Sequence, residues 1–207
     1  STVGGCPEGE LVKMIEKNKN GLKNEPIYFG TGFIAVSSDN KKVFITGLTN
    51  RYAAAPLSAI FSVSAPARTD FSVLFGDPLK AGNDQEHLGA KLGSMASDGK
   101  GNLLVADTAN GRVVIIGEAD GKFKGEFKTE NPKGLGVDRR NGAVYITSDI
   151  GEAVFVRKFN NWQEGKQISE GKLPRKGWTP NHSMALDAST DPVVVWVSAG
   201  GDGHLIR

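Results

Sequence analysis

Asn181 and His182 are adjacent in the sequence Thr-Pro-Asn-His-Ser, just before a run of apolar residues. An asparagine oxygen suits calcium, and a neutral imidazole suits zinc. Both metals need further ligands, which would have to come from other parts of the chain or from residues beyond it. The pair is therefore a candidate for part of a metal site. The other interpretation is a polar turn whose side chains cap the adjacent strand.

The motifs of common catalytic sites are absent from the sequence. It contains no Gly-x-Ser-x-Gly, no His-Glu-x-x-His, no Cys-x-x-Cys and no P-loop. Cys6 is the only cysteine, so an intrachain disulfide is excluded, and no His or Asp lies near it to make it a nucleophile. We assign no catalytic residue, and whether the chain is an enzyme stays uncertain, with the balance against it.

Two polar stretches are candidates for binding a partner. Trp162 and Trp178 lie within residues 160–180, and Asp84 and His87 lie within residues 77–89. Polar, Gly-containing stretches of this length are expected to form surface loops, and surface loops often carry binding residues. We therefore predict a protein partner at these two loops.

Charge and hydropathy narrow the possible partners and location. The formal net charge of the 207 residues is +2, which provides no strong field for nucleic acid. No apolar run approaches the ~18 residues of a membrane span. We expect a soluble protein, either cytoplasmic or lumenal or secreted after removal of a leader; the sequence does not decide between them.

An internal repeat dominates the organisation of the chain. Four segments share one pattern: a small residue and an apolar residue, then a turn containing Asp, Asn or Gly, and then a β-rich run. The segments are residues 33–46, 94–107, 135–148 and 184–198. The core residues Ile45, Val105, Ile146 and Val197 are separated by 60, 41 and 51 residues. A blade of a β-propeller takes about 40–50 residues, and a long loop at 77–89 explains the largest spacing.

The second repeat indicates four strands in detail. We expect strands at 94–97, 103–106, 112–116 and 122–128, joined by Gly-containing turns. The third repeat predicts strands at 144–147, 153–157 and 163–168, and the first repeat predicts strands at 59–63 and 71–75. A two-sheet β-sandwich also uses short strands and glycine turns, but it does not require the recurrence of one motif.

Residues 101–116 (GNLLVADTANGRVVII) resemble the NHL repeat, whose core has a glycine, a β-run, Ala-Asp and then Asn-x-Arg. Residues 132–148 and 179–197 resemble its preceding Pro-x-Gly half. The resemblance implies an all-β fold, a β-propeller of four-stranded antiparallel blades in the six-bladed TolB-like and gluconolactonase-like superfamily. The chemistry of Asp107, Asn110 and Arg112 independently predicts a structural role. Asp107 is expected to accept hydrogen bonds from the backbone or Asn110 and fix the turn, and Arg112 to pair with a carboxylate or carbonyl of a neighbouring blade.

The internal repeat also predicts how the chain is divided. Residues 1–207 form one propeller domain, seen in part, with about four to four and a half blades. Residues 1–29 are expected to belong to a preceding blade, with β-structure at 10–15 and 26–29; the alternative for residues 10–15 is a short helix. Successive blade units follow at 30–91, 92–131, 132–178 and 179–207.

Relatives of this superfamily suggest two kinds of function. Metal-dependent lactonases hold one calcium or zinc with Glu, Asn, Asn and Asp, and Asn181 matches one Asn. Peptidyl-hydroxyglycine lyases place His in a Pro-His-Ser context, and His182 is similar to it. The leading hypothesis is nevertheless a non-catalytic interaction or scaffold module without a cofactor. The alternative is a metal-dependent hydrolase or lyase that uses the central channel.

Overall fold

The computed structural model describes residues 27–29, 32–50, 57–65, 70–174, 183–199 and 204–206. Almost all of the regular secondary structure in these residues is β-strand. The first four-stranded sheet comprises β2 (Ile34–Val36), β3 (Lys42–Ile45), β5 (Ala59–Ser64) and β6 (Ser72–Gly76). The second comprises β7 (Met95–Ser97), β8 (Asn102–Asp107), β9 (Arg112–Gly117) and β10 (Phe123–Lys128). The third comprises β11 (Pro132–Val137), β12 (Val144–Ile150), β13 (Ala153–Phe159) and β14 (Gln167–Pro174).

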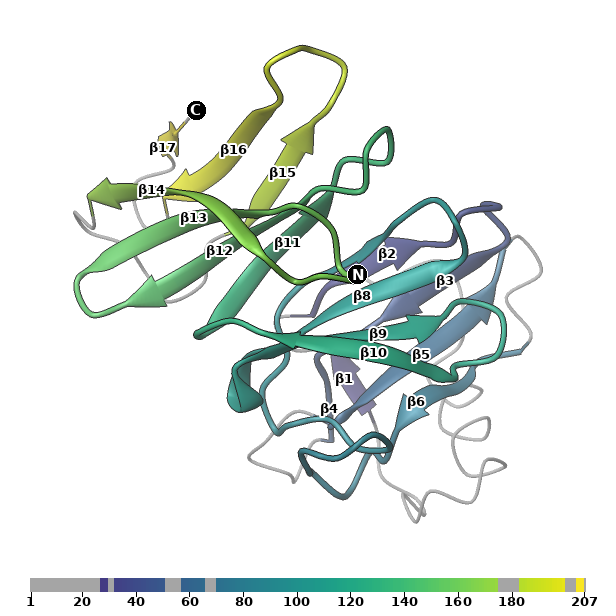
Figure 1. The fold of residues 1–207 in the computed structure, drawn as a ribbon. Helices are drawn as coiled ribbons and strands as arrows, with labels where there is room; N and C mark the ends of the chain where they lie inside the picture. Colours follow the sequence, from purple (N-terminus) through teal and green to yellow (C-terminus); the bar gives the residue numbers. More distant parts are fainter. Residues whose placement is uncertain are drawn as a thin grey trace.

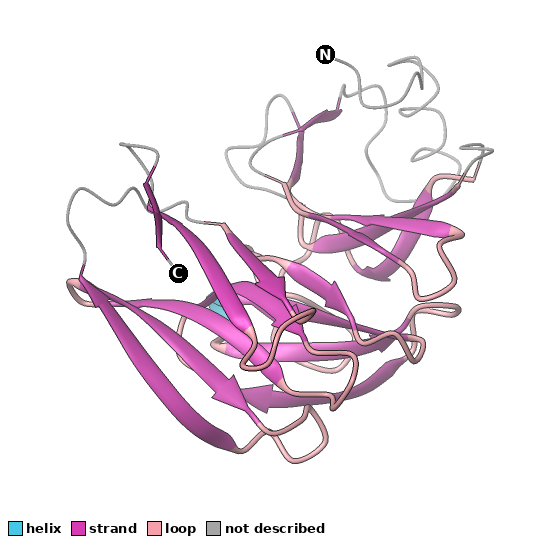
Figure 2. Ribbon diagram, turned by 90° about the horizontal axis from the view of Figure 1, so that it is seen from above, coloured by secondary structure: helices cyan, strands magenta, loops and turns pink. Residues whose placement is uncertain are grey.

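Two smaller sheets complete the described part. The fourth sheet has the order β15 (Met184–Asp187), β16 (Val194–Ala199) and β17 (His204–Ile206). A separate two-stranded sheet pairs β1 (Ile27–Phe29) with β4 (Leu48–Asn50). Every pairing in the first four sheets is antiparallel. Each described strand in them pairs with the next strand along the chain, except that β3 pairs with β5 because β4 belongs to the two-stranded sheet. Figure 1 shows the sheets following one another in chain order, and Figure 2 shows them from above.

The hairpin between β8 and β9 shows how the sequence makes these sheets. Asp107 and Arg112 are the last paired residues, and a short 3-10 helix (Thr108–Asn110) joins them. Gly111 ends this helix at φ 58°, in the left-handed region that glycine enters without a steric penalty. The apolar runs on both sides then pair along their full length.

Successive sheets pack face to face through their alternating side chains. Leu103 and Val105 of β8 pack with Phe44 and Ile60 of the first sheet. Their neighbours Leu104 and Ala106 pack with residues of the third sheet instead, among them Leu135 and Ile146. A strand with a period of two exposes one set of side chains on each face, so β8 is buried on both.

The fourth sheet lies close against the third. A Cβ atom on Gly134 of β11 would be 2.7 Å from the Cβ of Met184, and one on Gly136 would be 3.1 Å from the Cβ of Leu186. The two strands β11 and β15 thus approach more closely than larger residues would permit.

The four-stranded antiparallel sheets confirm the predicted all-β fold class, and some predicted details are wrong. The outer strand expected at 163–168 is β14, which begins only at Gln167, because residues 160–166 form a hydrogen-bonded turn. Residues 160–180 are therefore not one loop. The β4 strand was not predicted, and the β-structure expected at 10–15 lies outside the described residues.

Candidate functional site

Arg112, at the start of β9, is the largest fully buried side chain in the described part of the chain, with 1% of its surface exposed. Its Nε donates to Oδ2 of Asp107 at 2.9 Å, and its Nη1 donates to Oε2 of Glu126 at 2.6 Å. These ion pairs join three adjacent strands, β8, β9 and β10. A buried guanidinium needs acceptors for its N–H groups, and the two carboxylates provide part of them.

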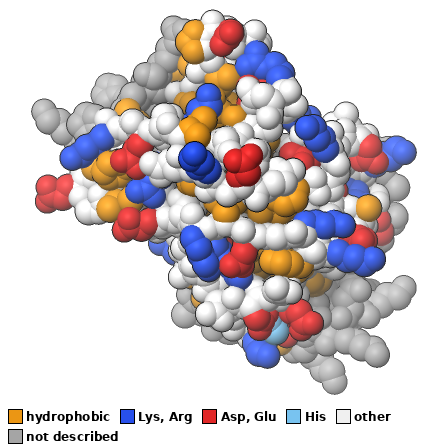
Figure 3. Space-filling view, viewed as in Figure 1, with side chains coloured by type: hydrophobic (Ala, Val, Ile, Leu, Met, Phe, Trp, Pro, Cys, Tyr) orange, Lys and Arg blue, Asp and Glu red, His pale blue; other side chains and the backbone are white. Residues whose placement is uncertain are grey.

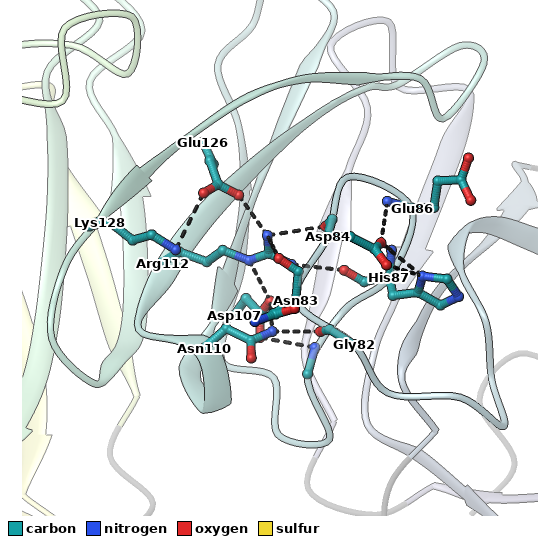
Figure 4. Close-up of polar contacts among 11 residues, drawn as sticks. Gly82, Asn83, Asp84, Glu86, His87, Asp107, Asn110, Arg112, Glu126 and Lys128 are labelled. Atoms are coloured by element: carbon teal, nitrogen blue, oxygen red, sulfur yellow. Dashed lines mark hydrogen bonds and ion pairs between the residues drawn. The ribbon is translucent and has the colours of Figure 1, made fainter.

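The other acceptors of Arg112 are carbonyl groups of the segment between β6 and β7 (Figure 4). Nη1 donates to the carbonyls of Asn83 and Asp84 at 2.9 and 3.1 Å, and Nη2 donates to the carbonyl of His87 at 2.8 Å. One side chain therefore fixes the backbone at three points. We call residues 82–89 the arginine-anchored loop.

Asp107 and Asn110 hold the same loop from the hairpin turn. Oδ1 of Asp107 accepts a hydrogen bond from the N–H of Gly89 at 3.1 Å. Nδ2 of Asn110 donates to Oδ2 of Asp107 and to the carbonyl of Gly82, both at 2.7 Å. A Cβ atom on Gly89 would be 2.6 Å from Oδ1 of Asp107, so a glycine permits this close approach.

The loop exposes its acidic side chains while its backbone is fixed. The side chain of Asp84 is 61% exposed, whereas that of His87 is only 14% exposed. Asp84 accepts hydrogen bonds from the N–H groups of Glu86 and His87, and Nδ1 of His87 lies 2.8 Å from its Oδ1. In Figure 3, acidic side chains gather around a histidine on the face drawn there.

These contacts shift the pKa values of two carboxyl groups. The hydrogen bond from the backbone of Glu86, and then the one from His87, hold the pKa of Asp84 below its usual range. Desolvation by burial raises the pKa of Glu126, but the hydrogen bond and charge of Arg112 outweigh it, so the pKa of Glu126 is lowered. Both groups are therefore held as carboxylates near neutral pH.

Five of the residues singled out in the sequence meet in this network: Asp84, His87, Asp107, Asn110 and Arg112. In the sequence these residues belong to two separate groups, one within residues 77–89 and one within residues 101–116. The hydrogen bond between Asn110 and Asp107 is present, as expected. Arg112 was expected to pair with a carboxylate or carbonyl of a neighbouring blade. The carbonyls that it binds lie within residues 30–91, the preceding unit predicted from the sequence, whereas its carboxylate partners, Asp107 and Glu126, belong to its own sheet.

Glu126 was missed by the sequence reasoning. Lys128 is directly opposite Arg112 in the pairing of β10 with β9, so Glu126 is the diagonal neighbour of Arg112 on the same face. The strand pairing could have identified it. Nothing in the sequence marks the carbonyls of Asn83, Asp84 and His87 as acceptors.

The remaining sequence candidates lie elsewhere. Trp162 is half-buried in the turn between β13 and β14, away from the arginine-anchored loop. Trp178, Asn181 and His182 lie outside the described residues. Within the described ranges, no group of three or more His, Cys, Asp or Glu residues could hold a metal ion. No helix there is both long and apolar enough to cross a membrane.

Comparison with known proteins informs the fold. No protein-family model matches the chain, and the search of curated proteins gave no match. Among solved structures, the chain is similar to a propeller in the crystal structure of a nidogen–laminin complex, with a TM-score of 0.56 and 16% identity. That match covers 82% of this chain and 56% of the other.

A second similar structure is a functionally unknown protein from Desulfotomaculum acetoxidans DSM 771, with a TM-score of 0.51 and 14% identity. It covers 84% of this chain and 54% of the other, so the chain spans little more than half the length of either protein. At these identities the likeness concerns the fold alone. Together with the successive four-stranded antiparallel sheets, it shows that the described sheets are blades of a β-propeller.

Proposed function

We propose that this chain is a non-catalytic propeller of the NHL kind that binds a protein partner through the arginine-anchored loop. The observation that carries the proposal is the contrast within this loop. The side chains of Asp84 and Glu86 are exposed. The backbone of the loop is nevertheless fixed by hydrogen bonds at five residues: Gly82, Asn83, Asp84, His87 and Gly89. A loop already fixed in one conformation loses less entropy when it binds.

The NHL assignment is supported by the residues that hold the loop. Asp107, Asn110 and Arg112 carry the resemblance in the sequence, and all three contact the arginine-anchored loop. In this proposal the motif has a structural role, and the loop it supports makes the contacts with the partner.

The charge of the loop indicates the chemistry of the partner surface. Asp84 and Glu86 are acidic and exposed, and residues 82–89 contain no Lys or Arg; Lys80 and Lys91 are the basic residues nearest to them in sequence. Opposite charges across an interface increase association rates and favour the correct partner. The proposed partner therefore presents a basic patch to this loop.

The test compares two charge reversals. The exposed Glu86 side chain makes no hydrogen bond with the described residues, so Glu86→Lys should leave the fold intact. Glu152→Lys, in the exposed turn between β12 and β13, is the matched control. Proteins captured from the source organism by the wild-type chain are identified, and the purified partner is titrated against all three forms.

We expect Glu86→Lys to raise the Kd about tenfold, equivalent to ~1.4 kcal/mol, and Glu152→Lys to change it less than about twofold. The affinity of the wild-type chain should also fall with added salt. Equal affinities for the two variants would rule out this loop as the binding surface. Failure of the wild-type chain to capture any partner specifically would contradict the interaction function.

A further inference from the structure

A groove with a volume of about 310 Å³ lies where three turns of the second and third sheets meet. The turns are residues 98–101, 139–142 and 160–166, and we call the space between them the turn groove. These turns follow β7, β11 and β13. The hairpin turn at Thr108–Asn110 follows β8, so it lies at the opposite end of the strands. The turn groove is thus separate from the arginine-anchored loop. Its volume is at the lower end of the ~300–1,000 Å³ of ordinary ligand sites.

The three turns are packed against one another. A Cβ atom on Gly99 would lie 2.9 Å from Cδ of Arg139, so the first turn touches the second. A Cβ on Gly142 would lie 4.0 Å from that of Asn161, which places the second turn beside the third. Contacts of this kind give the groove a fixed shape before any ligand arrives.

The third turn is also fixed internally. The side-chain oxygen of Asn160 accepts hydrogen bonds from the N–H groups of Asn161 and Lys166. The two amide side chains of Asn160 and Asn161 donate to the carboxylate of Glu164 at 2.5 and 3.1 Å. Glu164 is exposed but held in place, with acceptor capacity remaining on both oxygens.

Trp162 provides an aromatic surface in the turn groove. It is half-buried against the core between the second and third sheets, and a Cβ on Gly125 of β10 would be 3.6 Å from its Cζ3 atom. Its indole N–H has no hydrogen-bond partner among the described residues. The ring is therefore anchored by packing, and its N–H remains available to a ligand.

Two other polar groups that line the groove also have no partner in the described part of the chain. They are the ammonium group of Lys100 and the side-chain amide of Gln163. By contrast, the carboxylate of Asp98 already accepts three hydrogen bonds, from Lys100 N–H and from Asn102 N–H and Nδ2. The turn groove thus combines free donors, the acceptor Glu164 and one aromatic ring.

The mixed charges of the groove disfavour an ionic ligand. A cation would meet Lys100, and an anion would meet Asp98 and Glu164. A neutral molecule with several hydroxyl groups and a C–H face would satisfy the Gln163 amide, Lys100 and Glu164, and could lie against Trp162. We propose that the turn groove binds a sugar, with one pyranose ring on Trp162.

The test uses saturation-transfer NMR on the whole chain with four probes: the methyl β-pyranosides of glucose, galactose and N-acetylglucosamine and the methyl α-pyranoside of mannose. A neutral, blocked Gly-Pro-Ser-Gly peptide is the competing probe. The variant Lys100→Ala/Gln163→Ala removes two free polar groups at exposed positions. Lys122→Ala, an exposed lysine in another turn, is the matched control, and circular dichroism checks that each variant is folded.

We expect at least one pyranoside to bind, with saturation greatest at the C–H face of its ring. The double variant should weaken binding about tenfold, as expected for the loss of two hydrogen bonds, and Lys122→Ala should leave it unchanged. Trp162→Phe, which keeps an aromatic ring but removes the N–H, should weaken it less. Binding of no pyranoside would overturn the proposal, as would equal binding by wild type and double variant. Binding of the peptide alone would assign the groove to a peptide instead.

Discussion

Nε of Arg112 lies 2.9 Å from Oδ2 of Asp107, and both side chains are buried, with 1% and 0% of their surfaces exposed. The two residues face each other across the end of the β8–β9 hairpin. A buried ion pair costs desolvation energy, and the attraction between the charges offsets it only where further hydrogen bonds satisfy their remaining groups. Here four of those bonds come from the loop, so the hairpin and the arginine-anchored loop are energetically coupled.

Removal of Arg112 should therefore be among the most destabilising changes in the second sheet. Arg112→Ala leaves Asp107 as an unpaired buried charge, and we expect a loss of about 3–5 kcal/mol in the free energy of unfolding. Arg112→Lys should also destabilise the chain, because an ammonium group cannot reach all the acceptors of the guanidinium. Urea unfolding measures both.

The matched control for Arg112 is an exposed cation. Lys122 is 76% exposed and pairs with Asp120 at 3.4 Å, so Lys122→Ala should change stability by less than about 1 kcal/mol. A loss of the same size in Arg112→Ala and in Lys122→Ala would show that the buried network contributes little.

The close approach of the loop to the hairpin predicts a specific effect at Gly89. In Gly89→Ala the new methyl group would meet Oδ1 of Asp107 and the Cβ of Ala109, at 2.6 and 2.7 Å. We expect a loss of about 1–3 kcal/mol, as for other overpacked positions, and faster amide hydrogen exchange at residues 82–89.

Gly171 on β14 provides the comparison for this substitution. No atom lies within 4 Å of a Cβ built there, and no positive φ strains the position. Gly171→Ala should be neutral or slightly stabilising, because alanine reduces the entropy of the unfolded chain. If Gly89→Ala were equally neutral, the loop would have to be able to move away from Asp107.

Much of this fold could be predicted from the sequence because each strand and turn is determined by residues that are adjacent in the chain. The strands 102–107 and 112–117 follow from two apolar runs separated by an Asn-Gly turn, and the repeat supplied the order of the sheets. The position of β14 could not be predicted, because residues 160–166 form a turn through side-chain hydrogen bonds of Asn160 and Asn161. These residue types are common in ordinary loops as well.

Three side chains of the candidate site could be predicted from the sequence, but the groups that they bind could not. Asp107, Asn110 and Arg112 stood out by their spacing. Their main partners are backbone groups about 20 to 30 residues earlier in the chain, and every residue has a carbonyl and nearly every one an N–H group. The sequence therefore named the anchors of the loop without showing what they hold.

Acid should destabilise the protein through its hydrogen-bonded carboxylates. Hydrogen bonds and charge from Arg140 hold the pKa of the buried Asp138 below its ordinary value of 3.8. The folded state thus binds this proton less tightly than the unfolded state does. The stabilisation is complete above the unfolded pKa and is lost as the pH falls through the folded pKa.

Urea unfolding at pH 7 and at pH 3 measures this dependence. We expect the unfolding midpoint of the wild-type chain to fall at the lower pH, and the fall to be smaller in Asp138→Asn, in which this group no longer titrates. An identical fall in both proteins would show that Asp138 does not contribute to the acid sensitivity.

Metal content distinguishes the interaction module from the metal-dependent alternative suggested by Asn181 and His182. If the chain is a non-catalytic module, elemental analysis of the purified protein should find neither calcium nor zinc at one equivalent, and His182→Ala should give the same result. The physical reason is that two adjacent side chains cannot complete a calcium or zinc coordination shell alone. A stoichiometric metal that is lost in His182→Ala would contradict the non-catalytic function. It would also direct the search to lactone and hydroxyglycine substrates.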